Sequence, residues 1–143
     1  MEKRTLAALN LLRDNGIKPS PQRLAIYNYL CEHNTHPSVE TVYGDLVQLY
    51  PTLSRTTVYQ TLVALCEKDL AQKLTIEEGT MRFDATTSDH GHFRCTKCRR
   101  IFDFSLPKET QFPHPQGGFS VHRIHLYEYG ICPECQGQYK DRT

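Results

Sequence analysis

Apolar positions in the first half of the chain recur every three or four residues, which predicts helices. The first predicted helix spans residues 3–15, with leucines on one face and a glycine just past its end. Ser20 followed by Pro21 is typical of a helix start, because serine caps the helix and proline fits its first turn. Ser38 and Ser54 are expected to cap a third and a fourth helix.

The expected inward faces of these helices share this spacing of apolar side chains. In chain order they are Leu6, Leu9 and Leu12; Leu24, Tyr27 and Cys31; Val42, Leu46 and Leu49; and Val58, Leu62 and Leu65. Because Cys31 and Cys66 lie on apolar helix faces, both are expected to be ordinary buried thiols.

After Leu70 the pattern changes from helical to alternating. AQKLTI and MRFDAT, separated by the turn EEGT, predict a two-stranded hairpin. Helices followed by a hairpin are typical of a winged helix-turn-helix. We therefore expect such a domain over residues 1–85.

Residues 86–89 are polar and form the expected linker. Beyond them, HGHFRC, RRIFDF and FSVHRIHLYEYGIC read as strands. Between the last two, residues 106–118 contain prolines and a Gly-Gly pair that leave room for little more than one helical turn. The expected fold class is therefore α+β, an N-terminal winged helix-turn-helix followed by a small α/β domain over residues 90–143.

Charge excludes a bulk polycation as the basis of any nucleic-acid binding. The net charge of the 143 residues is +1. Residues 1–85 contain nine Lys/Arg and ten Asp/Glu, a net charge of −1, and the remainder contains eight and six, a net charge of +2. Binding to DNA must then rest on a few placed cations and a shaped element.

The chain begins with no apolar run of signal-peptide length, and no segment is apolar enough to span a bilayer. We therefore expect a cytoplasmic protein without membrane contact. In a reducing cytosol, six cysteines favour metal binding over disulfides.

Two CxxC pairs dominate the second half of the chain. Cys95 and Cys98 form one pair, and Cys132 and Cys135 form the other. Two such turns supply the four thiolates of a tetrahedral Zn²⁺ site, which a domain this small needs for stability. A redox dithiol and a pair of disulfides are the alternatives. Both CxxC pairs are expected in turns, whereas a thioredoxin-like pair opens a helix, so we favour structural zinc.

A second group of potential ligands is made of histidine and aspartate. His90 and His92 alternate on a strand, so both point to one face. Asp103 stands between two phenylalanines and Asp84 ends the hairpin, and a partly buried carboxylate needs a cation or strong donors. With His36, these nitrogen and oxygen ligands suit Fe²⁺, Mn²⁺, Co²⁺ or Zn²⁺.

The same residues also fit ordinary roles that involve no metal. The two strand histidines can be surface residues, and His36 can be an ordinary loop histidine. Asp103 can form a salt bridge with Arg99 or Arg100.

Several characteristic stretches run through nearly the whole chain: KPSPQRLAIYNYL, HPSVETVY, LSRTTVYQTLVAL, MRFD, DHGHFRCTKC, IFDF and YGICPEC. Together they resemble the ferric uptake regulator (Fur) superfamily, and within it the peroxide-sensing repressors, PerR.

The resemblance implies a homodimeric, metal-responsive repressor of double-stranded operator DNA, with a winged-helix domain and a dimerisation domain. It implies that the four paired cysteines hold structural Zn²⁺. It also implies a regulatory Fe²⁺ or Mn²⁺ site formed by His36, Asp84, His90, His92 and Asp103. Iron-sensing members usually carry Glu at the position of Asp103, which favours a peroxide sensor. His36 and His90 match the histidines that such sensors oxidise.

The fourth helix is the expected DNA reader. Thr56, Tyr59 and Gln60 lie opposite its apolar stripe and are free to enter a major groove. Glutamine pairs with adenine, and threonine and aromatic groups contact thymine methyls, so an A·T-rich operator is expected.

Three cations are candidates for contacts to the DNA backbone and minor groove. Arg55 at the start of the fourth helix is placed to reach phosphate. Lys18 and Arg23 flank the start of the second helix, and the family lysine at the position of Lys18 enters the minor groove.

The chain departs from the family pattern at a few positions. The usual helix is replaced by residues 106–118, and Ile124 stands where many members carry a histidine. His122 and His125 lie nearby at other positions. Gln60 replaces the usual Arg or Asn, so a different operator preference is an expectation at this position.

Three rival functions remain at this level. Within the family, the rival is an iron- or zinc-responsive uptake regulator without peroxide sensing. A zinc hydrolase is disfavoured because the sequence has no HExxH motif. A zinc-stapled interaction module without DNA binding is the third.

Overall fold

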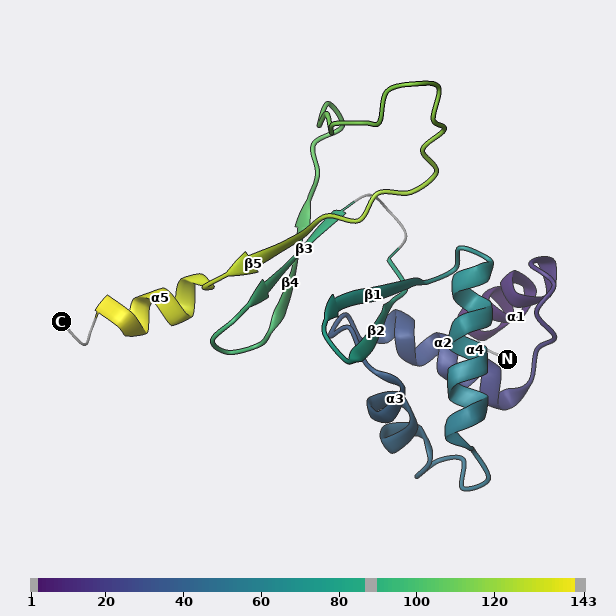
Figure 1. Ribbon diagram of the computed structural model, residues 1–143. Coiled ribbons are helices and arrows are strands. Elements are labelled where there is room, and N and C mark those ends of the chain that lie inside the picture. The colour runs from purple at the N-terminus through teal and green to yellow at the C-terminus, as the bar shows by residue number, and fades with distance from the viewer. Residues whose placement is uncertain (1–2, 87–89, 141–143) are drawn as a thin grey trace. The chain divides into compact units, whose positions relative to one another are not determined.

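The computed structural model describes residues 3–86 and 90–140 (Figure 1). The chain divides into two compact units, residues 1–87 and residues 88–143, here called the N-terminal and C-terminal units. Of the expected linker, residues 87–89 lie outside the described residues. No helix in the described part of the chain has the length and apolarity that crossing a bilayer requires.

The N-terminal unit is a helical bundle followed by a hairpin. Its elements are α1 (Lys3–Asp14), α2 (Pro21–Glu32), α3 (Val39–Leu46), α4 (Arg55–Glu67), β1 (Gln72–Glu77) and β2 (Thr80–Asp84). The strands pair antiparallel, with Gln72 opposite Asp84. This succession confirms the α+β class and the expected helices and hairpin.

Serine caps begin three of the helices, as the sequence indicates. The side chains of Ser20, Ser38 and Ser54 accept hydrogen bonds from backbone N–H groups of the first turns of α2, α3 and α4. Each bond satisfies one of the N–H groups that a helix start leaves without an intrahelical partner. Gly16, with a φ of 78°, follows the end of α1 in the left-handed conformation that glycine tolerates.

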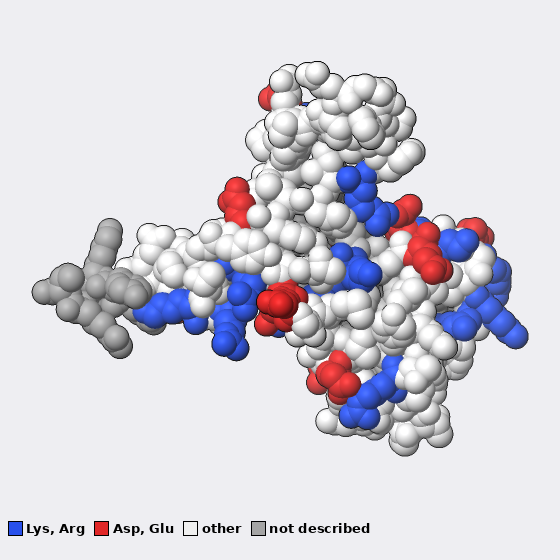
Figure 2. All heavy atoms as spheres, viewed as in Figure 1, with Lys and Arg blue, Asp and Glu red and all other residues white. Residues whose placement is uncertain are grey.

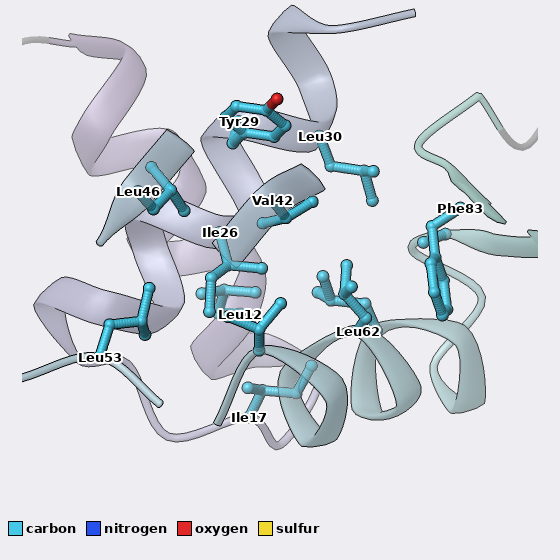
Figure 3. Close-up of a cluster of buried hydrophobic side chains, with 13 residues drawn as sticks. Leu12, Ile17, Ile26, Tyr29, Leu30, Val42, Leu46, Leu53, Leu62 and Phe83 are labelled. Carbon is cyan, nitrogen blue, oxygen red and sulfur yellow. The ribbon is translucent and has the colours of Figure 1, made fainter. Parts of the chain in front are cut away.

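One apolar core joins the four helices to the hairpin (Figure 3). Its fully buried side chains come from every helix and from β2: Leu12, Ile26, Leu30, Val42, Val58, Leu62, Leu65 and Phe83. The three inward positions expected on α4 are all completely buried. The core packs against one face of α4, and the opposite face of this helix lies on the surface.

Three expected inward faces are partly wrong. On α1 the buried residues are Ala8 and Leu12, whereas Leu6 is 49% exposed. On α2 the buried residues are Ile26, Tyr29 and Leu30, because apolar residues occur on several sides of this helix and their spacing selects no single face. Cys31, expected to be buried, is exposed. Leu49, expected on the inward face of the third helix, is 75% exposed because α3 ends at Leu46.

The C-terminal unit contains a three-stranded sheet and one helix. The strands are β3 (His90–Cys95), β4 (Ile101–Ser105) and β5 (Tyr127–Gly130), in the order β4-β3-β5. Strand β4 pairs antiparallel with β3, and β5 pairs parallel with it. Helix α5 (Pro133–Lys140) follows β5.

The last expected strand and the last helix are corrections to the sequence-based picture. Only Tyr127–Gly130 of FSVHRIHLYEYGIC is a strand. Residues 119–125 are exposed, so burial does not stabilise their alternating pattern as a strand. Helix α5 was not expected, although Pro133 suits the first turn of a helix.

Gly91 is required by the register of β3 and β4. It lies directly opposite Phe104, and a Cβ atom at Gly91 would come within 2.3 Å of the Phe104 ring. The ring therefore packs against the bare backbone of β3. Any side chain at position 91 must displace Phe104 and with it the pairing of the two strands.

Gly91→Ala should destabilise the C-terminal unit by about 1–3 kcal/mol, the usual cost of overpacking. Urea unfolding followed by circular dichroism measures this loss. Gly137→Ala is the matched control, because nothing lies within 4 Å of a Cβ at that position of α5. Alanine there should be neutral or stabilising by up to about 1 kcal/mol. Equal stability of the Gly91→Ala and wild-type proteins would contradict this packing.

Candidate metal centres

The four paired cysteines come together in the C-terminal unit. One sulfur atom from each of Cys95, Cys98, Cys132 and Cys135 lies within 4.8 Å of every other. Cys95 ends β3, and Cys98 lies in the turn to β4. Cys132 precedes α5 and Cys135 lies within it. The second pair thus spans the start of a helix, contrary to the expectation that both pairs sit in turns.

The distances between these sulfurs fit a tetrahedral zinc ion. Zn–S bonds of about 2.3 Å require sulfur separations of about 3.8 Å. The Sγ atoms of Cys98 and Cys132 lie 3.8 Å apart. The backbone N–H groups of Cys98 and Cys132 both donate to Sγ of Cys95, at 3.5 and 3.4 Å. Such bonds orient a thiolate and support its charge.

The opposed pKa shifts of two of the thiols also favour a cation at this site. Burial raises the pKa of Cys95, but hydrogen bonds from the backbone of Cys132 and Cys98 outweigh it and lower the pKa to about 5. Burial and its three cysteine neighbours raise the pKa of Cys135 to about 12. One thiol thus ionises readily while another is held neutral. A divalent cation removes this conflict by stabilising all four as thiolates, so the site is consistent with structural zinc.

In the N-terminal unit, His36 faces Asp84. Their Nε2 and Oδ2 atoms lie 3.7 Å apart, and both side chains are about 3% exposed. His36 lies between α2 and α3 with a φ of 56°, an uncommon conformation for any residue other than glycine. Asp84 ends β2, and its Oδ1 accepts a hydrogen bond from the backbone of Thr86 at 2.9 Å.

The turn that carries His36 is held against β2. Arg82 donates to the carbonyl oxygen of His36 at 3.2 Å and pairs with Glu77 at 2.9 Å. The N–H of Phe83 donates to the carbonyl of Pro37 at 3.0 Å. These bonds fix the backbone of the histidine beside the strand that ends in Asp84. The sequence analysis did not identify Arg82 as a residue that positions His36. The sequence feature that points to it is its position two residues before Asp84.

In the C-terminal unit, His90, His92 and Asp103 converge. Nε2 of His92 lies 3.0 Å from Nε2 of His90 and 3.2 Å from Oδ1 of Asp103. His90 and Asp103 are 3.9 Å apart. The cross-strand pairing of His92 with Asp103 produces this cluster, and the alternation along β3 adds His90. Gly91 lies between the two histidines and faces the opposite side of β3. The Phe104 ring packs against it there, so that side is apolar.

This convergence brings together atoms that all offer lone pairs. Nε2 of His92 lies within 3.2 Å of both Nε2 of His90 and Oδ1 of Asp103, and a single Nε2–H can donate to only one neighbour. A cation satisfies all three atoms at once. Asp103 is 35% exposed, less buried than its apolar neighbours in the sequence suggest. Arg100, one proposed salt-bridge partner of Asp103, pairs instead with Glu134.

The expected DNA-reading residues lie on the surface of the N-terminal unit. Thr56, Tyr59 and Gln60 are exposed on α4, opposite the core. Arg55 is also exposed, and its Nε donates to both carboxylate oxygens of Glu40 at 3.0 Å. Its guanidinium lies 4.3 Å from the ring centre of Tyr43. These contacts of Arg55 with α3 were not expected from the sequence.

Lys18 and Arg23 are linked at the start of α2, where Arg23 donates to the carbonyl oxygen of Lys18 at 2.6 Å. In the face drawn in Figure 2, basic and acidic side chains are interspersed over the N-terminal unit. This agrees with the charge count, which excludes a bulk basic surface.

Solved structures with the same architecture define the class of the protein. The ferric uptake regulator of Helicobacter pylori superposes with a TM-score of 0.69 at 24% identity, over 94% of this chain and 93% of that chain. PerR of Streptococcus pyogenes superposes with a TM-score of 0.54 at 33% identity, over 92% of each chain. Fold and ligand sets together are those of a metal-dependent transcriptional regulator, not an enzyme.

Sequence comparison gives the family. The model of the ferric uptake regulator family matches residues 14–129. The peroxide operon regulator of Bacillus subtilis is 37% identical over 131 residues, which are 90% of each chain. The peroxide-responsive repressor PerR of Staphylococcus aureus is 34% identical over 128 residues, 87% of this chain and 86% of that one. The chain belongs to the ferric uptake regulator family and is PerR-like.

Cys132→Ser should lose zinc and unfold the C-terminal unit, because the metal replaces a large core in a sheet this small. Metal analysis and circular dichroism measure the two effects. Cys31→Ser is the control, since Cys31 is exposed and lies outside the cluster. A Cys132→Ser protein that keeps a folded C-terminal unit without zinc would refute a structural role for the metal.

Proposed function

We propose that this chain is a peroxide-sensing repressor that binds A·T-rich operator DNA as a homodimer under the control of Fe²⁺ or Mn²⁺. One observation carries the proposal: each unit presents an incomplete set of imidazole and carboxylate ligands without a thiol. Regulators of this family bind operator DNA as dimers. The PerR-like relatives support the assignment of peroxide as the signal.

The regulatory ion is proposed to bind both ligand sets together. His36 and Asp84 supply two donors, too few to hold a divalent ion tightly. His90, His92 and Asp103 supply three. Together they give five nitrogen and oxygen donors, a set that suits Fe²⁺ or Mn²⁺ better than a thiolate-seeking metal. Zn²⁺ occupies the four cysteines and takes no part in sensing.

Such shared binding makes the metal a conformational switch. The proposed division of labour gives residues 1–85 the DNA contact, residues 86–89 the link, and residues 90–143 dimerisation and metal binding. Ligands from both parts hold the units in one arrangement when the ion is bound. The ion favours that arrangement by its higher affinity for it, and so sets the spacing of the two α4 helices in a dimer.

Operator contact is proposed to centre on α4. Its outward residues Thr56, Tyr59 and Gln60 suit the adenine edges and thymine methyls of a major groove. Arg55 is assigned a phosphate contact, for which it exchanges or shares its bond to Glu40. Lys18 and Arg23, joined at the start of α2, are assigned contacts beside the groove.

Asp84→Asn should impair metal-dependent DNA binding without affecting the fold. The amide preserves shape but removes the charge that binds the ion, so Mn²⁺ affinity should fall more than about tenfold, as even outer partners of metal ligands contribute that much. Structural zinc and helix content should be unchanged. Gel shift with an A·T-rich palindrome, with and without Mn²⁺, measures the effect on DNA binding.

The matched control for this variant is Asp14→Asn, which removes the same charge from the exposed end of α1. Its Mn²⁺-dependent DNA binding should equal that of the wild type. If Asp84→Asn also binds the operator with unchanged Mn²⁺ dependence, the shared regulatory site is wrong.

Peroxide is proposed to act on the histidines rather than on the cysteines. Bound Fe²⁺ supplies the reducing power that activates hydrogen peroxide next to the imidazole rings. In the net reaction one peroxide oxygen is added to a ring carbon of His36 or His90, and the other leaves as water. An oxidised ring is a weaker ligand, so the ion is released and the units lose their fixed arrangement. The cysteines are shielded as zinc-bound thiolates.

Peroxide treatment of the Fe²⁺ protein should therefore add one oxygen atom to the peptides that contain His36 or His90, in step with loss of operator binding. Peptide mass spectrometry and gel shift measure both. The Mn²⁺ protein is the control and should bind DNA without responding. If DNA release accompanies disulfide formation and zinc loss, with both rings intact, the mechanism is wrong. If neither metal form responds, an iron- or zinc-responsive uptake regulator is the better assignment.

A further inference from the structure

Arg100 lies at the exposed edge of the four-cysteine cluster. Its Nε donates a hydrogen bond to Sγ of Cys98 at 3.4 Å. Its guanidinium also pairs with the carboxylate of Glu134 and lies 5.3 Å from the ring centre of Phe102. The Arg100 side chain thus contacts a sulfur of the first CxxC, a glutamate inside the second CxxC, and a phenylalanine ring on β4.

Glu134 stands inside the second CxxC, between Cys132 and Cys135. The Arg100–Glu134 pair, here called the clasp, therefore joins the two CxxC segments that carry all four thiols. Cys98 is the exposed member of the four, whereas Cys95, Cys132 and Cys135 are buried. The clasp therefore contacts the sulfur of Cys98, which is the most exposed cysteine of the four. Figure 2 shows basic side chains gathered where the sheet meets α5.

The guanidinium of Arg100 lies beside a cluster that carries negative charge when zinc is bound. Four thiolates around one Zn²⁺ leave a net charge of about −2, which makes their sulfurs electron-rich. A guanidinium that donates to one of them withdraws electron density and fixes its orientation. Exposed ion pairs contribute little to folding stability, so the contacts of Arg100 act mainly on the sulfur rather than on the fold.

We propose that Arg100, held by Glu134, is a positioning residue that keeps Cys98 bound to Zn²⁺ and protects its sulfur from electrophiles. The inference rests on the proposed structural zinc site and is independent of peroxide sensing and DNA binding. Its sequence signal is a basic residue just after one CxxC and an acidic residue inside the other. Neither residue is a metal ligand.

The test follows zinc release from the zinc-loaded full chain during treatment with iodoacetamide. Sγ of Cys98 displaces iodide and forms a thioether, a neutral and poor ligand, so alkylation frees the metal. A chromogenic chelator, pyridylazoresorcinol, reports the rate of release. Peptide mass spectrometry reports which cysteine is alkylated first.

Arg100→Gln should release zinc about tenfold faster than the wild type, the lower end of what outer-shell partners contribute. Alkylation should begin at Cys98 and precede that of the three buried cysteines. Glu134→Gln, which loosens the arginine without removing it, should shift the rate the same way by a smaller factor. Arg100→Lys keeps the charge without the planar fork and should fall between wild type and Arg100→Gln.

Arg99→Gln is the matched control, because it removes one exposed charge from the same turn and should leave the rate unchanged. Wild-type rates in both Arg100→Gln and Glu134→Gln would overturn the proposal. So would simultaneous alkylation of all four cysteines, which marks general unfolding, or equal acceleration by Arg99→Gln. A wild-type chain that binds no zinc would overturn the zinc site and the clasp together. DNA binding enters none of these readouts, so failure of the repressor assignment is detected separately.

Discussion

The convergence of electron-pair donors that need a cation is the constraint on which the rest of this structure depends. Four sulfurs meet beside α5, and two imidazoles meet a carboxylate on β3 and β4. Without a positive charge, crowded thiolates repel each other, and the pKa of Cys95 is lowered while that of Cys135 is raised. The strands, turn and helix that carry these donors hold them close together despite the unfavourable interactions between them. The four-cysteine site is consistent with a structural zinc ion that stabilises the C-terminal unit, whose apolar core is small.

In the proposed function, two kinds of donor bind two metals with different roles. Thiolates bind zinc tightly and hold a structure, and they are covered by burial and by the contact of Arg100 with Cys98. Imidazoles and carboxylates bind Fe²⁺ or Mn²⁺ more weakly, which suits an ion that must come and go. Only two residues separate His92 from Cys95, yet the alternation of β3 and the turn after it direct them into different sites. In the proposed function this separation lets the sensor lose its ion while the dimerisation unit stays folded.

Local signals in the sequence predicted much of the fold and the grouping of the four paired cysteines. Three serine caps, the stripe on α4 and the two CxxC spacings each depend on neighbours within a few residues. Failures arose where tertiary contacts decide. The buried face of α2 is chosen by what packs against it, and the exposed segment 119–125 lacks the burial that its alternating pattern suggested. The bond between Arg82 and the His36 carbonyl joins residues 46 positions apart, and the clasp joins residues 34 apart. No local pattern specifies such pairs.

The central claim is that one regulatory ion takes ligands from both units. Pulsed electron paramagnetic resonance of the Mn²⁺-loaded protein tests it most directly, because it detects histidine nitrogens bound to the ion. The account predicts nitrogen couplings that weaken partly in His36→Ala and partly in His92→Ala, with Mn²⁺ affinity reduced in both. If His36→Ala retains the full nitrogen signal and the wild-type affinity, the ion belongs to the C-terminal unit alone and the switch proposed here is contradicted.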